Sequence, residues 1–164
     1  MITQEELKQI FFYDRNTGLF TRLIKTARRH KVGEVVGNYY GNGYMRAMIK
    51  GREYLLHRLA WLYVFGEIPA NMQIDHINGI KDDNRINNLR LATGYQNTSN
   101  QKISTRNKSG YKGVFFNKKY SKYQAQCVHR GKLYYIGVFE TADEAGMAYK
   151  DFALKKNGEF FRSR

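Results

Sequence analysis

A carboxylate and an imidazole stand side by side at Asp75-His76, and two asparagines follow at Asn88 and Asn97. Hydrolysis of a phosphodiester needs a base that activates water and a hard cation that stabilises charge on the phosphate. A neutral imidazole accepts a proton near neutral pH, and carboxylate and amide oxygens suit Mg²⁺ or Mn²⁺ better than soft ligands do. These residue types could therefore support metal-assisted hydrolysis, although an isolated Asp-His pair is equally typical of an ordinary loop.

Two short strands and a helix are expected around this pair. A strand contains Ile74, a polar loop spans 78–85, a second strand covers 89–91, and a capping-box pattern at 93–96 opens a helix with Asn97 in its first turns. Neighbours in a strand point to opposite faces, so Asp75 and His76 reach one site only if the strand ends or bends there. The turn residues at 78–79 permit such an end.

The segment 74–97 reads IDHINGIKDDNRINNLRLATGYQN, and residues 57–60 before it read HRLA. Together they resemble the HNH homing-endonuclease family, in the branch that has Asn in place of the last His. The resemblance implies a DNA endonuclease of phage or mobile-element origin. It also implies that His76 is the general base, that Asp75 and Asn97 hold a single divalent metal ion, Mg²⁺ or Mn²⁺, and that Asn88 hydrogen-bonds and orients His76.

Other polar residues near this segment are interpreted as structural. Asn forms local hydrogen bonds and tolerates left-handed backbone, so turn formation is favoured over catalysis for Asn78, Asn84 and Asn87. His57 opens a buried helix and is interpreted as a structural histidine whose side chain could support the site. His129 lies in basic surroundings and is expected to contact phosphate or solvent.

The composition favours a polyanionic partner. Among 164 residues, 28 are Lys or Arg and 14 are Asp or Glu, which gives a formal charge of +14. Nucleic acid is the first candidate, and a solvated basic surface or a membrane-surface binder remain alternatives. The single cysteine, Cys127, excludes an internal disulfide or a zinc ribbon and fits a reducing compartment. No apolar run approaches the ~18 residues of a membrane span, so we expect a cytoplasmic protein, in the host cytoplasm if phage-encoded.

The C-terminal region is basic and strand-rich. Residues 101–139 contain nine Lys or Arg and no Asp or Glu, and they read as strands at 113–116, 123–129 and 133–139 before a capping box at 141–144 opens a helix. The ordered patterns YKGV, YQAQ, YIGVF and TADEA resemble the apetala/ethylene-response type of DNA-binding domain over about residues 109–161. The resemblance implies that the three-stranded sheet lies in the major groove with the helix behind it.

Strand register decides which side chains of this sheet face outward. Phe115 and Asn117 stand where plant members of the family tend to place base-reading arginines, so no sequence preference is carried over. The expected DNA contacts are Lys112, Asn117, Lys119, Tyr123, Gln124, Gln126 and Arg130.

The predicted fold class is α+β: an N-terminal helix over about 4–12 and hairpins, a central ββα-metal motif, and a C-terminal three-stranded antiparallel sheet plus helix. The domains are a nuclease domain at 1–101 with its core at 72–101, a linker at 102–108, and a DNA-binding domain at 109–164. The favoured function is a metal-dependent endonuclease on double-stranded DNA, acting as a monomer or as a homodimer on DNA. The alternatives are a sequence-specific DNA-binding regulator without nuclease activity and, less favoured, an RNA-binding protein.

Overall fold

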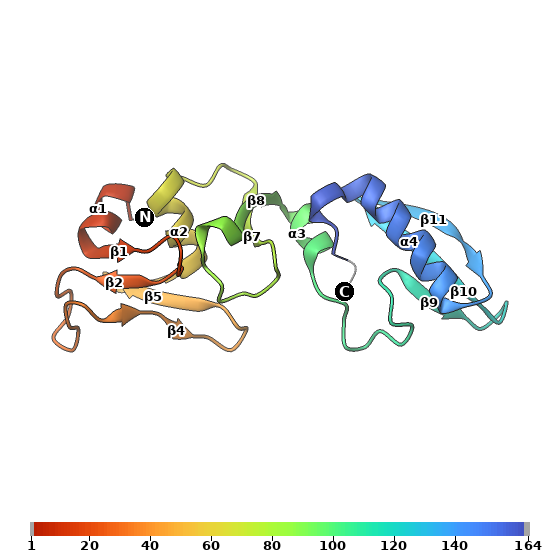
Figure 1. Ribbon diagram of the computed structural model, residues 1–164, viewed down its shortest axis with the longest axis horizontal. Coiled ribbons are helices and arrows are strands. Elements are labelled where there is room, and N and C mark those ends of the chain that lie inside the picture. The colour runs from red at the N-terminus through yellow and green to blue at the C-terminus, as the bar shows by residue number, and fades with distance from the viewer. Residues whose placement is uncertain (1, 163–164) are drawn as a thin grey trace. The chain divides into compact units, whose positions relative to one another are not determined.

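The computed structural model describes residues 2–162 and shows a mixed α and β protein built from small antiparallel sheets and short helices (Figure 1). The chain divides into two compact units, 1–93 and 94–164. No helix among the described residues is long and apolar enough to cross a membrane.

The first unit begins with α1 (Gln4–Ile10), whose first turn is closed by the expected capping box between Thr3 and Glu6. The helix ends at Ile10, two residues earlier than expected, because Phe11 adopts extended backbone and opens β1 (Phe11–Tyr13). That strand pairs with β2 (Phe20–Arg22), which in turn pairs with β3 (Val35–Val36). Tertiary pairing with β2 thus overrides the helical pattern at these positions.

A second sheet contains β4 (Asn38–Tyr39), β5 (Met45–Ile49) and β6 (Arg52–Leu55), and α2 (Leu56–Phe65) follows it directly. The core of this unit is apolar, and its largest fully buried side chains are Leu7, Phe11, Phe20, Leu56 and Leu59. This core also includes Ile74 and Leu89, which belong to the two strands expected to carry the site. The scaffold therefore packs against the site hairpin.

The site hairpin consists of β7 (Met72–His76) and β8 (Leu89–Thr93), which pair antiparallel with Asp75 opposite Arg90 and His76 opposite Leu89. Its connecting loop covers 77–88 and ends in a 3₁₀ turn, η1 (Ile86–Asn88). The two strands confirm the sequence prediction for 72–93.

The second unit contains α3 (Gly94–Asn100), a sheet of β9 (Val114–Asn117), β10 (Lys122–His129) and β11 (Lys132–Phe139), then α4 (Ala142–Asn157) and η2 (Gly158–Phe160). The strand order is β11-β10-β9, and the expected capping box between Thr141 and Glu144 opens α4. Val114, Ala125 and Ala145 form a small core between sheet and helix. Three strands and a helix were predicted here.

The boundary between the units falls between Thr93 and Gly94, whereas the sequence predicts a linker at 102–108. Contacts of α3 explain the difference, because the Tyr95 hydroxyl contacts Nδ1 of His129 and Lys112 Nζ donates to Ser99 O at 3.0 Å. The helix that follows β8 therefore packs with the C-terminal sheet. The assignment of a nuclease domain and a separate DNA-binding domain to these units stays a prediction.

Candidate active site

The adjacent Asp75 and His76 occupy the last two positions of β7, and each is 4% exposed. The strand ends here because a turn follows at once, with Gly79 N donating to His76 O at 2.8 Å and Gly79 in left-handed backbone at φ 65°. Glycine adopts this conformation without strain. The strand β7 thus ends directly after His76, and the service of both side chains in one site stays a prediction.

The buried carboxylate of Asp75 is compensated by Arg90, which lies directly across the hairpin. Arg90 Nε donates to Asp75 Oδ2 at 2.9 Å, and the two side chains are 12% and 5% exposed. A buried charge without such a partner would be strongly destabilising. A carboxylate oxygen is a suitable ligand for a hard cation. A metal ion bound to Asp75 would have to share this carboxylate with the Arg90 guanidinium.

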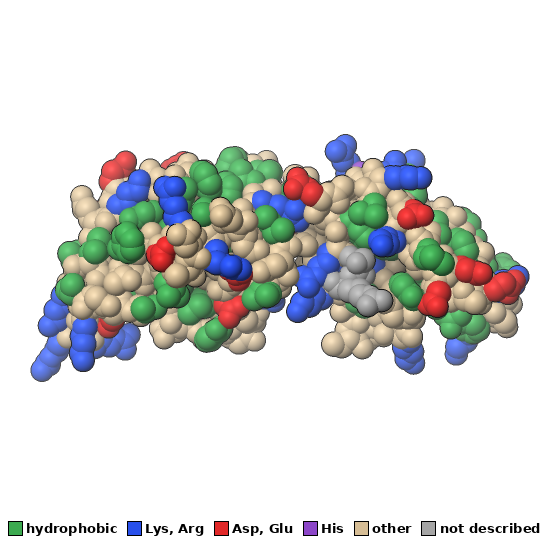
Figure 2. Space-filling model, viewed as in Figure 1, with side chains coloured by type: hydrophobic (Ala, Val, Ile, Leu, Met, Phe, Trp, Pro, Cys, Tyr) green, Lys and Arg blue, Asp and Glu red, His purple; other side chains and the backbone are tan. Residues whose placement is uncertain are grey.

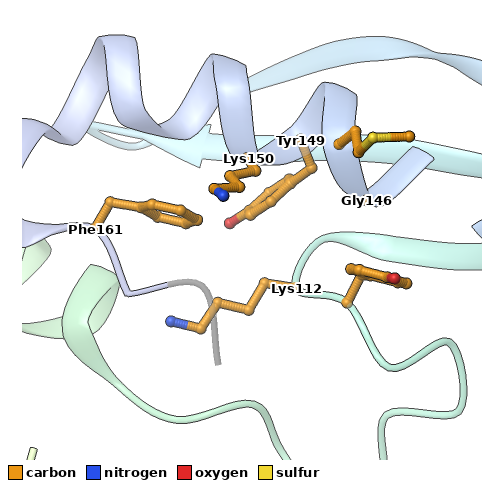
Figure 3. A pocket seen from close by; sticks show the side chains of 7 residues that line it. Lys112, Gly146, Tyr149, Lys150 and Phe161 are labelled. Atoms are coloured by element: carbon orange, nitrogen blue, oxygen red, sulfur yellow. The ribbon is translucent and has the colours of Figure 1, made fainter. Parts of the chain in front are cut away.

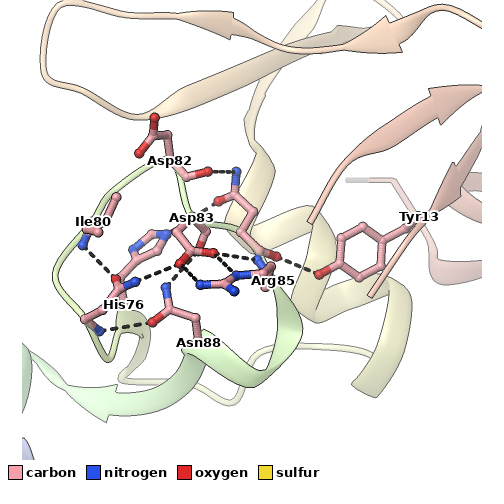
Figure 4. A network of polar contacts seen from close by, with 9 residues as sticks. Tyr13, His76, Ile80, Asp82, Asp83, Arg85 and Asn88 are labelled. Atoms are coloured by element: carbon pink, nitrogen blue, oxygen red, sulfur yellow. Dashed lines mark hydrogen bonds and ion pairs between the residues drawn. The ribbon is translucent and has the colours of Figure 1, made fainter. Parts of the chain in front are cut away.

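A polar network holds the loop 77–88 in one conformation (Figure 4). Asn88 Oδ1 accepts from Asn78 N at 3.0 Å, and Asn88 Nδ2 donates to Asp83 O at 2.8 Å. Asp83 in turn accepts from Asn78 Nδ2 at 2.7 Å and pairs with Arg85 at 2.6 Å. Asn88 therefore fastens the start of the loop to its middle.

The sequence predicts that Asn88 hydrogen-bonds His76, and the structure corrects this detail. The carbonyl and amide of Asn88 are directed to Asn78 and Asp83, and the ring of His76 has Asn84 as a neighbour, with His76 Nε2 and Asn84 Oδ1 3.4 Å apart. Asn88 therefore acts on the loop that surrounds His76. Its influence on the imidazole is indirect.

The sequence indicates that Asn84 is a turn former. In the structure it is also buried and hydrogen-bonded to the hairpin of β1 and β2. Tyr13 Oη donates to Asn84 O at 2.6 Å, as Figure 4 shows, and Ile86 N donates to Arg15 O at 3.2 Å. A Cβ at Gly18 would lie 2.5 Å from Arg85 N and from Asn84 C, so the hairpin backbone touches the loop. A contact across 71 residues leaves no local sequence pattern.

The imidazole of His76 lies against two other rings. The His57 ring is 4.9 Å away at an interplanar angle of 74°, and Tyr44 is 5.9 Å from His76 and 5.1 Å from His57, between ring centroids. Burial lowers the pKa of His76. Burial also lowers the pKa of His57 to about 3, and the neighbouring His76 and Arg58 are smaller causes of that shift. Both rings are therefore neutral at neutral pH, which is the form in which an imidazole accepts a proton.

His57 is a buried histidine whose ring lies beside that of His76, as the sequence interpretation of a structural histidine near the site expects. It is 5% exposed, and its Nδ1 has no hydrogen-bond partner among residues 2–162. An unpartnered buried nitrogen costs about 1–3 kcal/mol, so burial of a histidine here is not the most stable solution. Only the HRLA pattern at the start of α2 pointed to it.

Asn97 lies on α3 in the second unit, and Asp75, His76 and Asn88 lie in the first. Among the residues that the structure describes, no three His, Cys, Asp or Glu side chains form a group able to hold a metal. A metal ion at Asp75 would therefore need amide, water or phosphate oxygens for its other positions.

The expected DNA contacts divide between the two faces of the C-terminal sheet. Ala125 and Val114 face α4, so the alternate residues Asn117, Gln124 and Gln126 lie on the outer face, where Asn117 Nδ2 donates to Gln124 Oε1 at 3.1 Å. Lys119 and Arg130 lie in the turns at the two ends of β10.

Two members of this set are placed differently from the expectation. Tyr123 packs against the core beneath the sheet, and Lys112 is half-buried in a pocket beside α4. His129 also differs, because it is partly buried against Tyr95 and Asn157 instead of facing phosphate or solvent.

One family model matches part of the chain. Residues 54–99 match the family model described as HNH endonuclease, a segment that includes Asp75, His76, Asn88 and Asn97. This segment is thus an HNH endonuclease domain.

Two relatives are of viral origin. The "Uncharacterized HNH endonuclease L560" of Acanthamoeba polyphaga mimivirus is 36% identical over 106 residues, which is 64% of this chain and 54% of that protein. "Protein 3.8" of Escherichia phage T7 is 29% identical over 108 residues, covering 66% of this chain and 88% of the phage protein. The chain thus spans about half the length of the mimivirus relative.

A solved structure titled "DNA binding and cleavage by the HNH homing endonuclease I-HmuI" has a TM-score of 0.47 and 24% identity. The matched region covers 61% of this chain and 56% of the chain in that structure.

Proposed function

We propose that this protein is a metal-dependent DNA endonuclease in which His76 accepts the proton of the attacking water. The observation that carries the proposal is the neutral, buried His76 beside Asp75 at the end of β7, inside the segment that matches the HNH endonuclease family. His57 and Tyr44 brace the imidazole, and Asn84 and Asn88 hold the loop around it.

Asp75 and Asn97 are the proposed ligands of one divalent ion, Mg²⁺ or Mn²⁺, as the sequence resemblance implies. When bound, such an ion would stabilise negative charge on the scissile phosphate and the leaving oxygen. The contribution of the chain is to present oxygen donors, to keep His76 neutral and to fix its orientation. One such site per chain supports nicking by a monomer, or cleavage of both strands when two copies act.

Double-stranded DNA is the proposed substrate, held by the outer face of the β9-β10-β11 sheet in the manner of the apetala/ethylene-response type of domain. Amide side chains at Asn117, Gln124 and Gln126 can read base edges, while Lys119 and Arg130 can contact phosphate. Figure 2 shows lysine and arginine side chains distributed over the visible face of both units, in keeping with the formal charge of +14.

A plasmid assay tests the proposal. Supercoiled DNA is incubated with the protein and Mg²⁺ or Mn²⁺, with and without a chelator, and nicked and linear products are separated. Cleavage that the chelator abolishes is expected. If the protein binds permissive DNA but cleaves none of it with either Mg²⁺ or Mn²⁺, the result would favour the regulator that binds DNA without cutting it.

A further inference from the structure

A pocket in the C-terminal unit lies beside α4 and takes no part in the proposed cleavage chemistry (Figure 3). Its volume is about 450 Å³, within the range of roughly 300–1,000 Å³ that is typical of small-ligand sites. It is lined by Tyr111, Lys112, Gly146, Met147, Tyr149, Lys150 and Phe161. Three of these side chains are aromatic, two are cationic and none is acidic.

Two aromatic side chains that line the pocket, Tyr111 and Tyr149, pack closely against glycine residues. A Cβ at Gly146 would lie 2.3 Å from the Tyr111 ring, and one at Gly113 would lie 2.2 Å from the Tyr149 ring, so each ring rests directly on a glycine. Tyr111 Oη also donates to Asp143 at 2.7 Å. The rings of Tyr149 and Phe161 are 6.1 Å apart at 57°. The pocket therefore presents fixed aromatic surfaces.

Lys112 brings a partly buried positive charge to this pocket. Its Nζ donates to Ser99 O at 3.0 Å and lies 5.8 Å from the centre of the Phe161 ring, and no carboxylate pairs with it within residues 2–162. Burial, followed by repulsion from Arg162, lowers the pKa of Lys112 to about 8. An anion bound beside Lys112 and Lys150 would relieve this unfavourable burial.

We propose that this pocket binds one nucleotide of single-stranded DNA, with its base against Tyr149 and Phe161 and its phosphate at Lys112 and Lys150. Aromatic faces combined with cations are the means by which proteins bind unpaired nucleotides without reading sequence. The pocket is on the α4 side of the sheet, whereas Gln124 and Gln126 are on the outer face. It is therefore distinct from the surface proposed to hold the duplex, and its ligand does not depend on cleavage.

Titration of the full-length protein with the oligonucleotide pentathymidylate tests this site. Binding is followed by the methyl resonance of Met147 and by calorimetry, in the absence of divalent ions so that nuclease activity does not enter. Lys112→Met keeps the aliphatic stem, Phe161→Leu keeps apolar volume, and Lys150→Met changes an α4 side chain at the rim; each should lower affinity about tenfold. Lys155→Met, on the same helix but outside the pocket, should change it less than about twofold.

Three results would overturn the assignment. The first is wild-type affinity in all three pocket variants that remain folded by circular dichroism. The second is an equal loss in Lys155→Met, which would indicate general attraction between charges. The third is equally tight binding of a pentaaspartate peptide, which would indicate an anion site without preference for a nucleotide.

Discussion

At the scale of single residues, His76 depends on neighbours that come from distant parts of the chain. His57 from α2 and Tyr44 from the segment before β5 pack on its ring, and Asn84 lies at its Nε2. Asp75 and His76 were visible in the sequence as adjacent residues. The partners of their side chains were not, because they are fixed by how β7, α2 and the loop 77–88 pack together.

Substitution of His57 should separate packing from polarity. His57→Ala removes a buried ring, which should lower the free energy of unfolding by about 2 kcal/mol or more and reduce the cleavage rate about tenfold, since His76 loses its support. His57→Phe keeps a ring and removes the unpartnered Nδ1, so its stability should equal or exceed that of the wild type by roughly 1 kcal/mol. Urea unfolding and single-turnover cleavage measure both effects. Equal destabilisation by Phe and Ala would contradict this view of His57.

The depressed pKa of His57 also makes stability depend on pH. Between about pH 6.5 and the folded pKa of about 3, the unfolded chain binds a proton at His57 that the folded chain does not. The contribution of His57 to the free energy of unfolding is therefore fully present above pH 6.5. It falls as pH decreases, by up to about 1.4 kcal/mol per pH unit. Urea unfolding at pH 7, 6 and 5 should show a steeper loss in the wild type than in His57→Phe. Parallel curves would mean that folding leaves the pKa of His57 unchanged.

At the scale of elements, the loop 77–88 is held by the hairpin of β1 and β2. The local sequence predicted a polar turn after β7 and a strand at 89–91, and both are present. It could not show that Tyr13 and Gly18 fasten Asn84, because that contact joins residues 71 positions apart. The predicted helix at 4–12 loses its last residues to β1 for the same reason.

Gly18→Ala tests this anchoring, with Gly33→Ala as its control. Both glycines have left-handed backbone, at φ 75° and 84°, but a Cβ meets the Asn84 and Arg85 backbone at Gly18 and nothing within 4 Å at Gly33. Gly33→Ala should cost about 1–2 kcal/mol from backbone strain alone. Gly18→Ala should cost at least about 1 kcal/mol more and should also slow cleavage, as measured by urea unfolding and single-turnover assays. Equal costs in the two variants would argue against the anchor.

The C-terminal sheet shows why strand register had to come from the structure. The sequence predicted its strands, but buried Ala125 puts Gln124 and Gln126 on the outer face and leaves Tyr123 against the core. A register shift next to Ala125 in the pairing with β11 adds an irregularity that no alternation pattern reveals. Lys112 likewise lies on the α4 side of the sheet, where it lines the pocket.

The outer face should carry the DNA affinity of this sheet. Gln124→Ala and Gln126→Ala together should weaken binding to a preferred duplex about tenfold or more, because base contacts are lost while phosphate contacts remain. The slope of log affinity against log salt should stay the same. Tyr123→Phe, beneath the sheet, serves as the control and should bind like the wild type. A larger loss in Tyr123→Phe than in the glutamine variants would reverse the proposed orientation.

At the scale of the whole molecule, a formal charge of +14 is spread over a chain whose two compact units hold different candidate sites. The first unit contains Asp75 and His76, and the second contains the basic sheet, the pocket beside α4 and Asn97. The sequence predicted two functional regions from charge and motif. It placed the boundary after the helix that carries Asn97, because it could not show that this helix packs through Tyr95 against His129.

The central claim is that His76 is the base in metal-dependent DNA cleavage, and single-turnover cleavage of plasmid DNA by His76→Ala tests it most directly. His30→Ala serves as the matched control, because the His30 ring contacts the Thr26 hydroxyl at an exposed position outside the site, and DNA affinity is measured in parallel. We expect His76→Ala to bind DNA like the wild type and to cleave it at least about a hundredfold more slowly, with His30→Ala unchanged. Cleavage by folded His76→Ala at the wild-type rate would contradict the account.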